Sequence, residues 1–148
     1  MSDAAVAVAN LVYRYAECVD LGDFEGVGEL FADATYRAVT DGRVATMSGT
    51  QVTATLRSMV LTGEDGTPGT KHVTTNLIVD VDDEAGTATC RSYYTVLQVA
   101  PGLGLQPIIA GRYHDAFERV EGRWRFTDRL IYSDLIGDLR QHLRTNPY

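Results

Sequence analysis

Histidine and aspartate side chains at alternating positions of predicted strands are the first residues of this sequence that could carry chemistry. His72 begins a segment in which it shares one face with Thr74 and Asn76, while the other face is more apolar. Asp115 follows Tyr113 by two positions on the apolar face of a later segment. Imidazole and carboxylate groups are common general acids and bases, so these residues are candidates for acid–base chemistry.

Each of these candidates has a purely structural explanation as well. Hydrophobic alternation alone predicts that His72 faces water and Val73 faces the core, whereas a polar-lined pocket would reverse that orientation. A buried Asp115 needs a partner, and a salt bridge to an arginine explains it as well as a place in a binding site does. For Tyr94 and Tyr113, packing in the core is the alternative to contact with a ligand. The sequence leaves these alternatives open.

Several other kinds of catalytic site have no support in the sequence. It contains no nucleophile elbow, phosphate-binding loop, dinucleotide fingerprint or paired-histidine metal spacing. His72, His114 and His142 are far apart along the chain, and Cys18 and Cys90 form no zinc or redox motif. We therefore expect neither a metal ion nor a cofactor.

Length and composition are typical of an ordinary globular protein. The chain has 148 residues, of which 45% are hydrophobic and 22% charged, so we expect one domain over residues 1–148. The formal net charge of -7 argues against nucleic acid and anionic membrane as partners, since both attract clustered lysine and arginine. The nearest approach to a basic cluster, Arg140 to Arg144, is explained as well by a solvated helix end.

The location of the protein is predicted from features that the sequence lacks. No apolar run approaches the length of about 20 residues that spans a bilayer. The N-terminal segment has an early aspartate and no basic stretch, which indicates the start of a helix and not a signal peptide. Two scattered thiols suit a reducing compartment. We expect a cytoplasmic protein.

The first third of the sequence has the period of helices. Ser2 or Asp3 can cap a first helix that ends before Gly22, and Asp23 can cap a short second helix through Phe31. The apolar stripe of the first helix consists of Ala5, Val8, Ala9, Val12, Tyr15, Ala16 and Val19, with Asp20 at its edge.

From residue 70 onward the period changes to two, which is typical of strands. Before this change we expect short strands at 34–38 and 44–48, a third helix at 50–61 and a loop at 62–69. After it, we expect strands at 70–82, 87–99, 108–120 and 123–132, a Gly-rich loop at 101–107, and a last helical turn or two after 133. Helices followed by a strand meander predict an α+β fold in which helices cover one face of a curved sheet.

Several short motifs occur in an order that is characteristic of a known fold family. They are Arg14-Tyr15-Ala16, Asp20, Gly22-Asp23, Leu30-Phe31, Thr70-Lys71-His72, Asn76, Ser92-Tyr93-Tyr94, Gly111-Arg112-Tyr113-His114-Asp115, Gly122-Arg123-Trp124-Arg125-Phe126 and Arg129. Over about residues 5–132, their order and spacing resemble the SnoaL-like branch of the nuclear transport factor 2-like superfamily. The resemblance implies a cone-shaped, curved antiparallel sheet closed by the N-terminal helices. This cystatin-like half-barrel usually forms a homodimer or a higher homo-oligomer.

The resemblance also implies roles for particular residues. Scytalone dehydratase has an aspartate at the end of the first helix and a histidine that opens the first long strand, and Asp20 and His72 match them. The bile-acid dehydratase has a tyrosine five residues before the aspartate, which Tyr15 matches, and a C-terminal arginine, for which Arg129 is the match. A second histidine of scytalone dehydratase falls near Gln98, so that group is missing here. The patterns of ketosteroid isomerase and limonene epoxide hydrolase fit less well.

From this resemblance we expect Asp20, His72 and Tyr15 to be catalytic. An imidazole oriented by a carboxylate could move a proton from carbon to a departing hydroxyl, with the tyrosine donating a hydrogen bond to a carbonyl or enolate oxygen. The ligand would be a hydrophobic polycyclic or aromatic small molecule, and the reaction a dehydration, isomerisation or cyclisation. The residues expected to bind this ligand are Asn76, Tyr94, Tyr113, Asp115 and Arg129.

Two other functions are compatible with the same fold. Many members of the superfamily have no catalytic role, so the fold alone does not decide between them. The protein could bind or carry a small molecule without converting it. It could also be an assembly subunit that resembles the small subunit of ring-hydroxylating dioxygenases.

Overall fold

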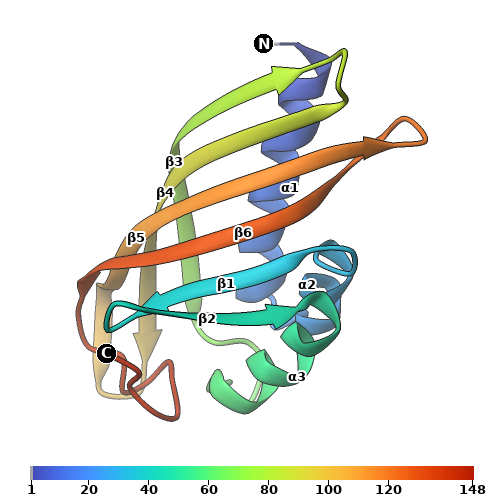
Figure 1. The fold of residues 1–148 in the computed structure, drawn as a ribbon. Coiled ribbons are helices and arrows are strands. Elements are labelled where there is room, and N and C mark those ends of the chain that lie inside the picture. The colour runs from blue at the N-terminus through green and yellow to red at the C-terminus, as the bar shows by residue number, and fades with distance from the viewer. Residues whose placement is uncertain (1) are drawn as a thin grey trace.

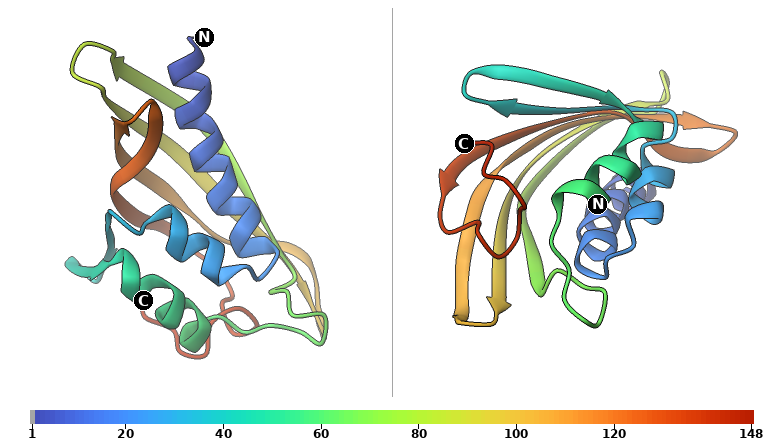
Figure 2. Two further views of the ribbon diagram at one scale, coloured as in Figure 1. Left: turned by 90° about the vertical axis from the view of Figure 1, so that its right-hand side faces the viewer. Right: turned by 90° about the horizontal axis from the view of Figure 1, so that it is seen from below.

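Three helices lie on the concave side of a six-stranded, curved and unclosed sheet, as the α+β cone predicted from the sequence requires. The structure is a computed structural model, and it describes residues 2–148. Figures 1 and 2 show the sheet curling around the helices. The elements are α1 (Asp3–Asp20), α2 (Phe24–Leu30), β1 (Thr35–Thr40), β2 (Arg43–Ser48), α3 (Gly49–Met59), β3 (Thr70–Asp82), β4 (Thr87–Ala100), β5 (Leu103–Val120) and β6 (Arg123–Ile136).

The strand order in the sheet is β2-β1-β6-β5-β4-β3. β1 pairs antiparallel with β2, and β3 to β6 form an antiparallel meander, while β2 and β3 are the two edge strands. The parallel pair of β1 and β6 joins the N-terminal hairpin to the meander. This parallel pair places residues 35–39 beside residues 128–132. The first helix, the first hairpin and the end of β6 therefore surround one interior space.

Helix α1 forms as its sequence predicts. The Ser2 side chain accepts a hydrogen bond from the backbone N–H of Ala5, and the expected apolar stripe is buried along the whole helix. Gly22 ends the turn after the helix with a φ of 72°, where an added Cβ would lie 2.2 Å from the carbonyl oxygen of Gly66. Only glycine fits this turn, which leaves Asp20 in the last turn of the helix, facing the start of β3.

A bulge in β3 changes which residues face the interior. The pairing of β3 with β4 shifts register between Thr75 and Ile78, and Asn76 has a φ of 57°. Before the bulge His72 points inward, whereas Val73 is 41% exposed. After it, Leu77, Val79 and Val81 are the partly buried residues packed against the core. The orientation expected from uninterrupted alternation was therefore wrong for His72 and Val73, because the strand is not continuous.

Two other local predictions were wrong near the end of the chain. β5 begins at Leu103, so only Pro101 and Gly102 form the turn that was expected to be a longer loop. β6 continues to Ile136, so no helix begins at 133. Residues 137–148 instead form an irregular segment, called the C-terminal segment here, that lies beside α3 at the lower end of the sheet (Figures 1 and 2).

Backbone contacts fix the C-terminal segment to the end of α3. The Leu61 N–H donates to the carbonyl of His142 at 2.8 Å, and the Arg144 N–H donates to the carbonyl of Met59 at 2.9 Å. The buried Gln98 side chain donates from Nε2 to the carbonyl of Gln141 at 3.0 Å. These contacts hold the segment across the wide end of the half-barrel.

The bulge predicts a specific response to substitution at Asn76. Asn76→Gly should leave stability within about 1 kcal/mol of the wild type, because glycine adopts positive φ freely. Asn76→Val should lower the free energy of unfolding by about 1–3 kcal/mol, because a β-branched residue is strained there. Urea unfolding measures both values. Equal stability of the two variants would contradict the positive φ of Asn76, and with it the bulge.

Candidate functional site

The carboxylate of Asp20 at the end of α1 accepts three hydrogen bonds from the first residues of β3. The Thr70 hydroxyl donates to Oδ1 at 2.8 Å, and the backbone N–H of His72 donates to Oδ2 at 2.7 Å. The imidazole Nδ1 of His72 lies 2.6 Å from Oδ1. The side chains of His72 and Asp20 are only 7% and 9% exposed, so the contact is shielded from water.

These hydrogen bonds determine the ionisation of Asp20. Burial opposes its charge, but the hydrogen bonds from His72 and Thr70 outweigh burial and lower the pKa of the carboxyl. An ionised carboxylate can only accept hydrogen bonds, so the hydrogen-bond pattern assigns the imidazole proton to Nδ1 of His72. Nε2 then carries the free lone pair, as in a general base oriented by a carboxylate.

The imidazole of His72 lies on the wall of an apolar cavity of about 180 Å³. Asp20 does not line the cavity but lies behind the imidazole, on an outer groove beside Glu17 and Lys71. The cavity walls come from α1, α3, the sheet and the C-terminal segment. They consist of Tyr15, Val19, Tyr36, Ala38, Met47, Val52, Thr55, Leu56, Met59, Val60, His72, Tyr94, Val96, Ile109, Tyr113, Ile131, Ser133, Leu139, His142, Leu143, Pro147 and Tyr148.

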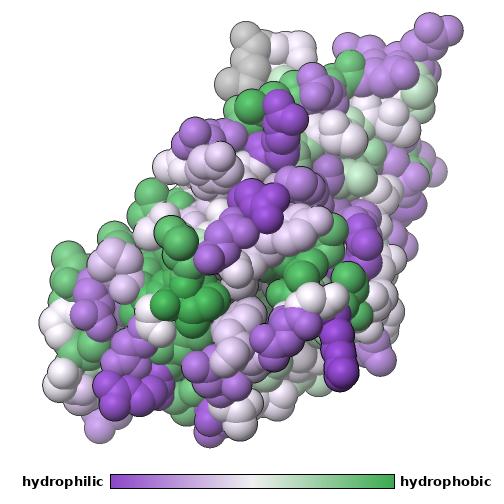
Figure 3. Space-filling model, turned by 60° about the vertical axis from the view of Figure 1, so that its left-hand side comes forward, coloured by the Kyte–Doolittle hydropathy of each residue, from purple (hydrophilic) through white to green (hydrophobic). Residues whose placement is uncertain are grey.

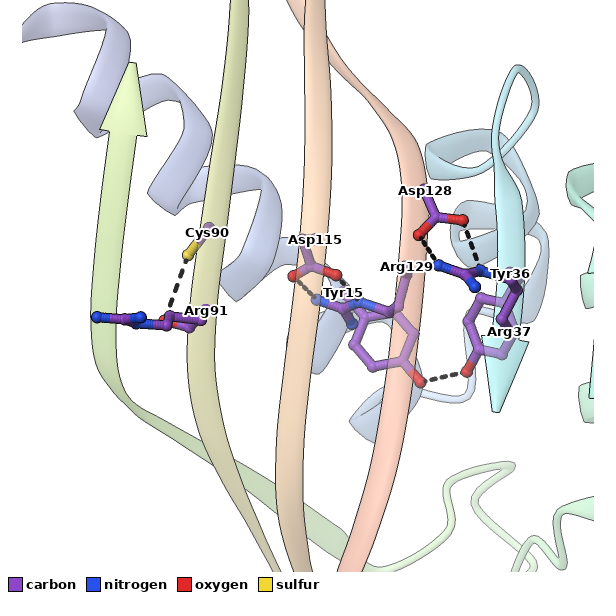
Figure 4. Close-up of polar contacts among 8 residues, drawn as sticks. All are labelled: Tyr15, Tyr36, Arg37, Cys90, Arg91, Asp115, Asp128 and Arg129. Carbon is purple, nitrogen blue, oxygen red and sulfur yellow. Dashed lines mark hydrogen bonds and ion pairs between the residues drawn. The ribbon is translucent and has the colours of Figure 1, made fainter. Parts of the chain in front are cut away.

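Tyr15 and Tyr36 form a hydroxyl pair on this wall. Their hydroxyl oxygens are 2.8 Å apart, and either can be the donor (Figure 4). Burial raises the pKa of both hydroxyls, so both keep their protons. The ring of Tyr15 stands edge-on to the imidazole of His72 at 6.3 Å between centroids. Tyr36 was not identified from the sequence, although its place in the first short strand was.

Tyr94 and Tyr113 also line the cavity, with their rings stacked at 4.5 Å between centroids. The Tyr94 hydroxyl donates to the carbonyl of Tyr132 at 3.1 Å and lies 3.1 Å from the hydroxyl of Ser133. Gly111 leaves room for it, since an added Cβ would lie 2.7 Å from that hydroxyl oxygen. Both tyrosines combine core packing with a place on the cavity wall.

The structure pairs Asp115 and Arg129 with each other behind this wall. Two hydrogen bonds of 2.8 Å join the guanidinium to the carboxylate, and neither side chain is exposed (Figure 4). The guanidinium packs 3.8 Å from the ring centroid of Tyr113 and 4.3 Å from that of Tyr15. Burial opposes its charge, but the attraction of Asp115 raises the pKa of Arg129. The pair supports the aromatic wall and is not part of the cavity lining, so its placement favours the salt bridge over ligand contact.

Asn76 is not brought to the cavity either. It is exposed at the bulge of β3, on the side of the sheet where Ile78 and Arg91 also lie. Asn76 was expected to contact the ligand because uninterrupted alternation would place it on the same face as His72. The bulge interrupts this alternation. Of the eight residues expected to form the site, the structure places Tyr15, His72, Tyr94 and Tyr113 on the cavity wall.

Like Tyr36, His142 is a cavity residue that was not identified from the sequence. The basic stretch around it was expected to be a solvated helix end, yet His142 is only 8% exposed and lines the cavity. Burial, and then the nearby charge of His72, lower its pKa to about 4, although Asp20 acts in the opposite direction. Its imidazole is therefore neutral at physiological pH. Nothing in the hydrophobic pattern of an irregular segment signals such a placement.

Groups of acidic, histidine and cysteine side chains that could hold a metal ion are absent among residues 2–148. Within the same residues, none of the helices has the length and apolar character needed to cross a membrane.

Comparisons with known proteins agree with this architecture. A family model described as a SnoaL-like domain matches residues 1–130. No curated protein sequence matches the chain significantly.

Solved structures share the fold at low sequence identity. One is a scytalone dehydratase-like protein from Novosphingobium aromaticivorans, with 24% identity, a TM-score of 0.68, and coverage of 89% of this chain and 85% of that one. A nuclear transport factor 2-like protein with a cystatin-like fold from the same organism has 22% identity, a TM-score of 0.68, and coverage of 86% and 79%. The beta subunit of an aromatic-ring-hydroxylating dioxygenase-like protein, also from this organism, has 20% identity, a TM-score of 0.71, and coverage of 90% and 90%.

The buried ion pair predicts a large loss of stability when it is broken. Arg129→Met should lower the free energy of unfolding by about 3–5 kcal/mol, because it leaves Asp115 buried without a partner. The matched control is Arg112→Met at a half-exposed pair with Asp134, which should cost less than about 1 kcal/mol. Urea unfolding compares the two. A loss at Arg129 no larger than at Arg112 would contradict the structural role.

Burial of His142 predicts a pH dependence of stability. Between its ordinary pKa of 6.5 and its folded value of about 4, the unfolded chain binds a proton that the folded chain does not. Stability should therefore fall by up to roughly 3 kcal/mol as the pH drops through this window. Urea unfolding at several pH values should show a shallower slope for His142→Leu than for the wild type. Equal slopes would mean that this imidazole is not buried in the folded protein.

Proposed function

The chain belongs to the SnoaL-like domain family, and from this premise we propose that it is a cofactor-independent acid–base enzyme acting on an apolar, ring-containing small molecule. The observation that carries the proposal is the contact between Asp20 and His72. It presents an oriented imidazole to a cavity whose other walls are mostly aromatic and aliphatic. A fold of this kind is a small-molecule-binding or catalytic scaffold, and the oriented base favours catalysis.

In the proposed reaction His72 is the base. Its Nε2 takes a proton from a carbon next to a carbonyl group, and Asp20 stabilises the imidazolium that forms. The hydroxyl pair of Tyr15 and Tyr36 donates a hydrogen bond to the carbonyl oxygen as negative charge develops there. The apolar walls exclude water, which strengthens each of these electrostatic interactions.

Three related reactions can follow once His72 has taken the proton, and they differ in which group then receives a proton. When the imidazolium gives the proton to a departing hydroxyl on the same face, water leaves and a carbon–carbon double bond forms, which is a syn dehydration. Return of the proton to a different carbon is an isomerisation. Attack of the enolate on a second carbonyl of the same molecule, followed by protonation of the new alkoxide, is an aldol-type cyclisation. All three use the same base and the same oxyanion donors.

The size of the cavity limits the ligand. A dry cavity of about 150 Å³ in another protein holds one benzene ring. The present volume of about 180 Å³ therefore suits a single ring or a small fused pair of rings. A larger polycyclic ligand would require the C-terminal segment to move.

A second candidate function is that of an assembly subunit. The likeness to a dioxygenase-like beta subunit favours it, although that likeness concerns the fold. An assembly subunit has no need of an oriented, buried imidazole on a cavity wall. A protein that only binds or carries its ligand would use the same cavity without turnover.

We also propose that the protein is a cytoplasmic homodimer. Its two cysteines are free in the structure, which suits a reducing compartment. Exposed apolar residues include Tyr93, Leu105 and Leu135, and Figure 3 shows hydrophobic side chains gathered in the lower half of one face. Sedimentation of the purified protein should show a self-contained dimer. Copurification with a large subunit, and no stable dimer without it, would favour the assembly function instead.

Replacement of His72 separates catalysis from binding. In an assay with cyclic hydroxyketones, His72→Gln should lower kcat by about 10²–10⁴-fold while binding of an inert aromatic ligand is retained. His114→Gln is the matched control, because His114 is exposed on the outside of the sheet and its replacement should leave kcat unchanged. Unchanged turnover in the His72 variant, or no turnover in the wild type either, would remove the catalytic proposal.

A further inference from the structure

Two histidines, His72 and His142, line the cavity, and the proposed reaction gives a role only to His72. His142 comes from the C-terminal segment, while His72 comes from the start of β3. Both imidazoles line the same cavity. They are also close enough for the charge of one to affect the other, since His72 lowers the pKa of His142.

The imidazole of His142 lacks a hydrogen-bond partner in the described structure. Its Nδ1 is buried and makes no hydrogen bond. Several other polar groups on the wall do have partners: Tyr15 bonds to Tyr36, and Ser133 contacts both Tyr94 and Tyr148. Buried polar groups in proteins are nearly always hydrogen-bonded. Four other buried side chains, those of Thr74, Ser92, Gln98 and Arg129, also have an unpartnered atom, but of the five only His142 lines the cavity, where a ligand can supply the partner.

The backbone holds His142 in place before any ligand binds. Its N–H donates to the carbonyl of Leu139 at 3.0 Å, and its carbonyl accepts from Leu61 at 2.8 Å. The next carbonyl toward the N-terminus, that of Gln141, accepts from the buried Gln98 amide. A group that is fixed in advance loses little entropy when it binds, so His142 is suited to fix the orientation of a ligand.

We propose that His142 is a second ligand-binding imidazole of the site, which hydrogen-bonds an oxygen of a cyclic ketone, enol or phenol whose reacting carbon faces His72. This inference rests on the proposed function, since it takes His72 as the base. A neutral imidazole donates from one nitrogen and accepts at the other, so it can bind a carbonyl, an enol or a hydroxyl oxygen. Because it carries no charge, it also does not compete with His72 for the carboxylate of Asp20.

The role of His142 as a hydrogen-bond donor has a chemical consequence for the proposed reaction. A neutral imidazole that donates to the substrate oxygen stabilises the enolate without transferring a full proton. Together with the Tyr15–Tyr36 pair, it gives the cavity two separate donor groups. The site therefore favours substrates with two oxygens on or next to one ring, such as a hydroxyketone.

The experiment uses 2-naphthol as an enol analogue and naphthalene as a probe of the same shape without oxygen. In the ¹⁵N-labelled wild type, 2-naphthol should shift the imidazole nitrogen signals of both His72 and His142, whereas naphthalene should leave the His142 signals largely unchanged. His142→Leu should bind 2-naphthol about tenfold more weakly, because one buried hydrogen bond is lost. The same variant should bind naphthalene as the wild type does. His114→Leu, outside the cavity, should match the wild type with both probes.

The outcomes separate this inference from the proposed function. If 2-naphthol shifts His72 but not His142, or if His142→Leu binds both probes as the wild type does, the role of His142 is overturned while the His72 base stands. If His142→Leu does not fold, the wild-type signals decide alone. If 2-naphthol at saturating concentration shifts neither histidine, the proposed ligand class is overturned. Loss of turnover in His72→Gln tests the base independently of both probes.

Discussion

A carboxylate buried at the end of a helix must find hydrogen-bond donors, and this requirement organises the cavity end of the fold. Asp20 finds all three donors on the first residues of β3: the Thr70 hydroxyl, the His72 backbone N–H and the His72 imidazole. Removal of any of them would leave the largely buried carboxylate with one donor fewer. The contact therefore fixes how α1 meets β3, and it holds His72 inward on the same face as Thr70 and Thr74. The bulge at Asn76 then returns the apolar side chains of β3 to the interior.

Two buried carboxylates in this protein illustrate how burial alone fails to distinguish structure from function. Asp115 and Arg129 use their charges on each other, and aromatic rings cover the guanidinium. Asp20 instead orients an imidazole that keeps a free nitrogen on a cavity wall. The two sites differ in whether a polar atom is still free to bind a ligand once the internal hydrogen bonds have formed. By that criterion we propose chemical roles for His72 and His142, whereas the Asp115–Arg129 pair packs behind Tyr15 and Tyr113.

Much of the fold could be predicted from the sequence, because the hydrophobic residues of a long amphipathic helix or strand recur with the period of that structure. The stripe of α1 and the four long strands follow the pattern that the residues show. The bulge could not be predicted, because asparagine at positive φ leaves no trace in hydrophobic alternation. The early start of β5 was missed because Gly-rich sequence usually marks loops, yet here it continues a paired strand. His142 was missed because the C-terminal segment has no regular period, so only tertiary contacts with Met59, Leu61 and Gln98 decide where it lies.

The central claim is that Asp20 holds His72 as an oriented base, and the tautomer of that imidazole tests it most directly. Long-range ¹H–¹⁵N NMR at mildly alkaline pH distinguishes a protonated Nδ1 from a protonated Nε2. We expect His72 to carry its proton on Nδ1, hydrogen-bonded to the carboxylate, and Asp20→Asn to abolish this preference. A His72 spectrum with the proton on Nε2, or with the averaged signals of a free imidazole in both proteins, would contradict it.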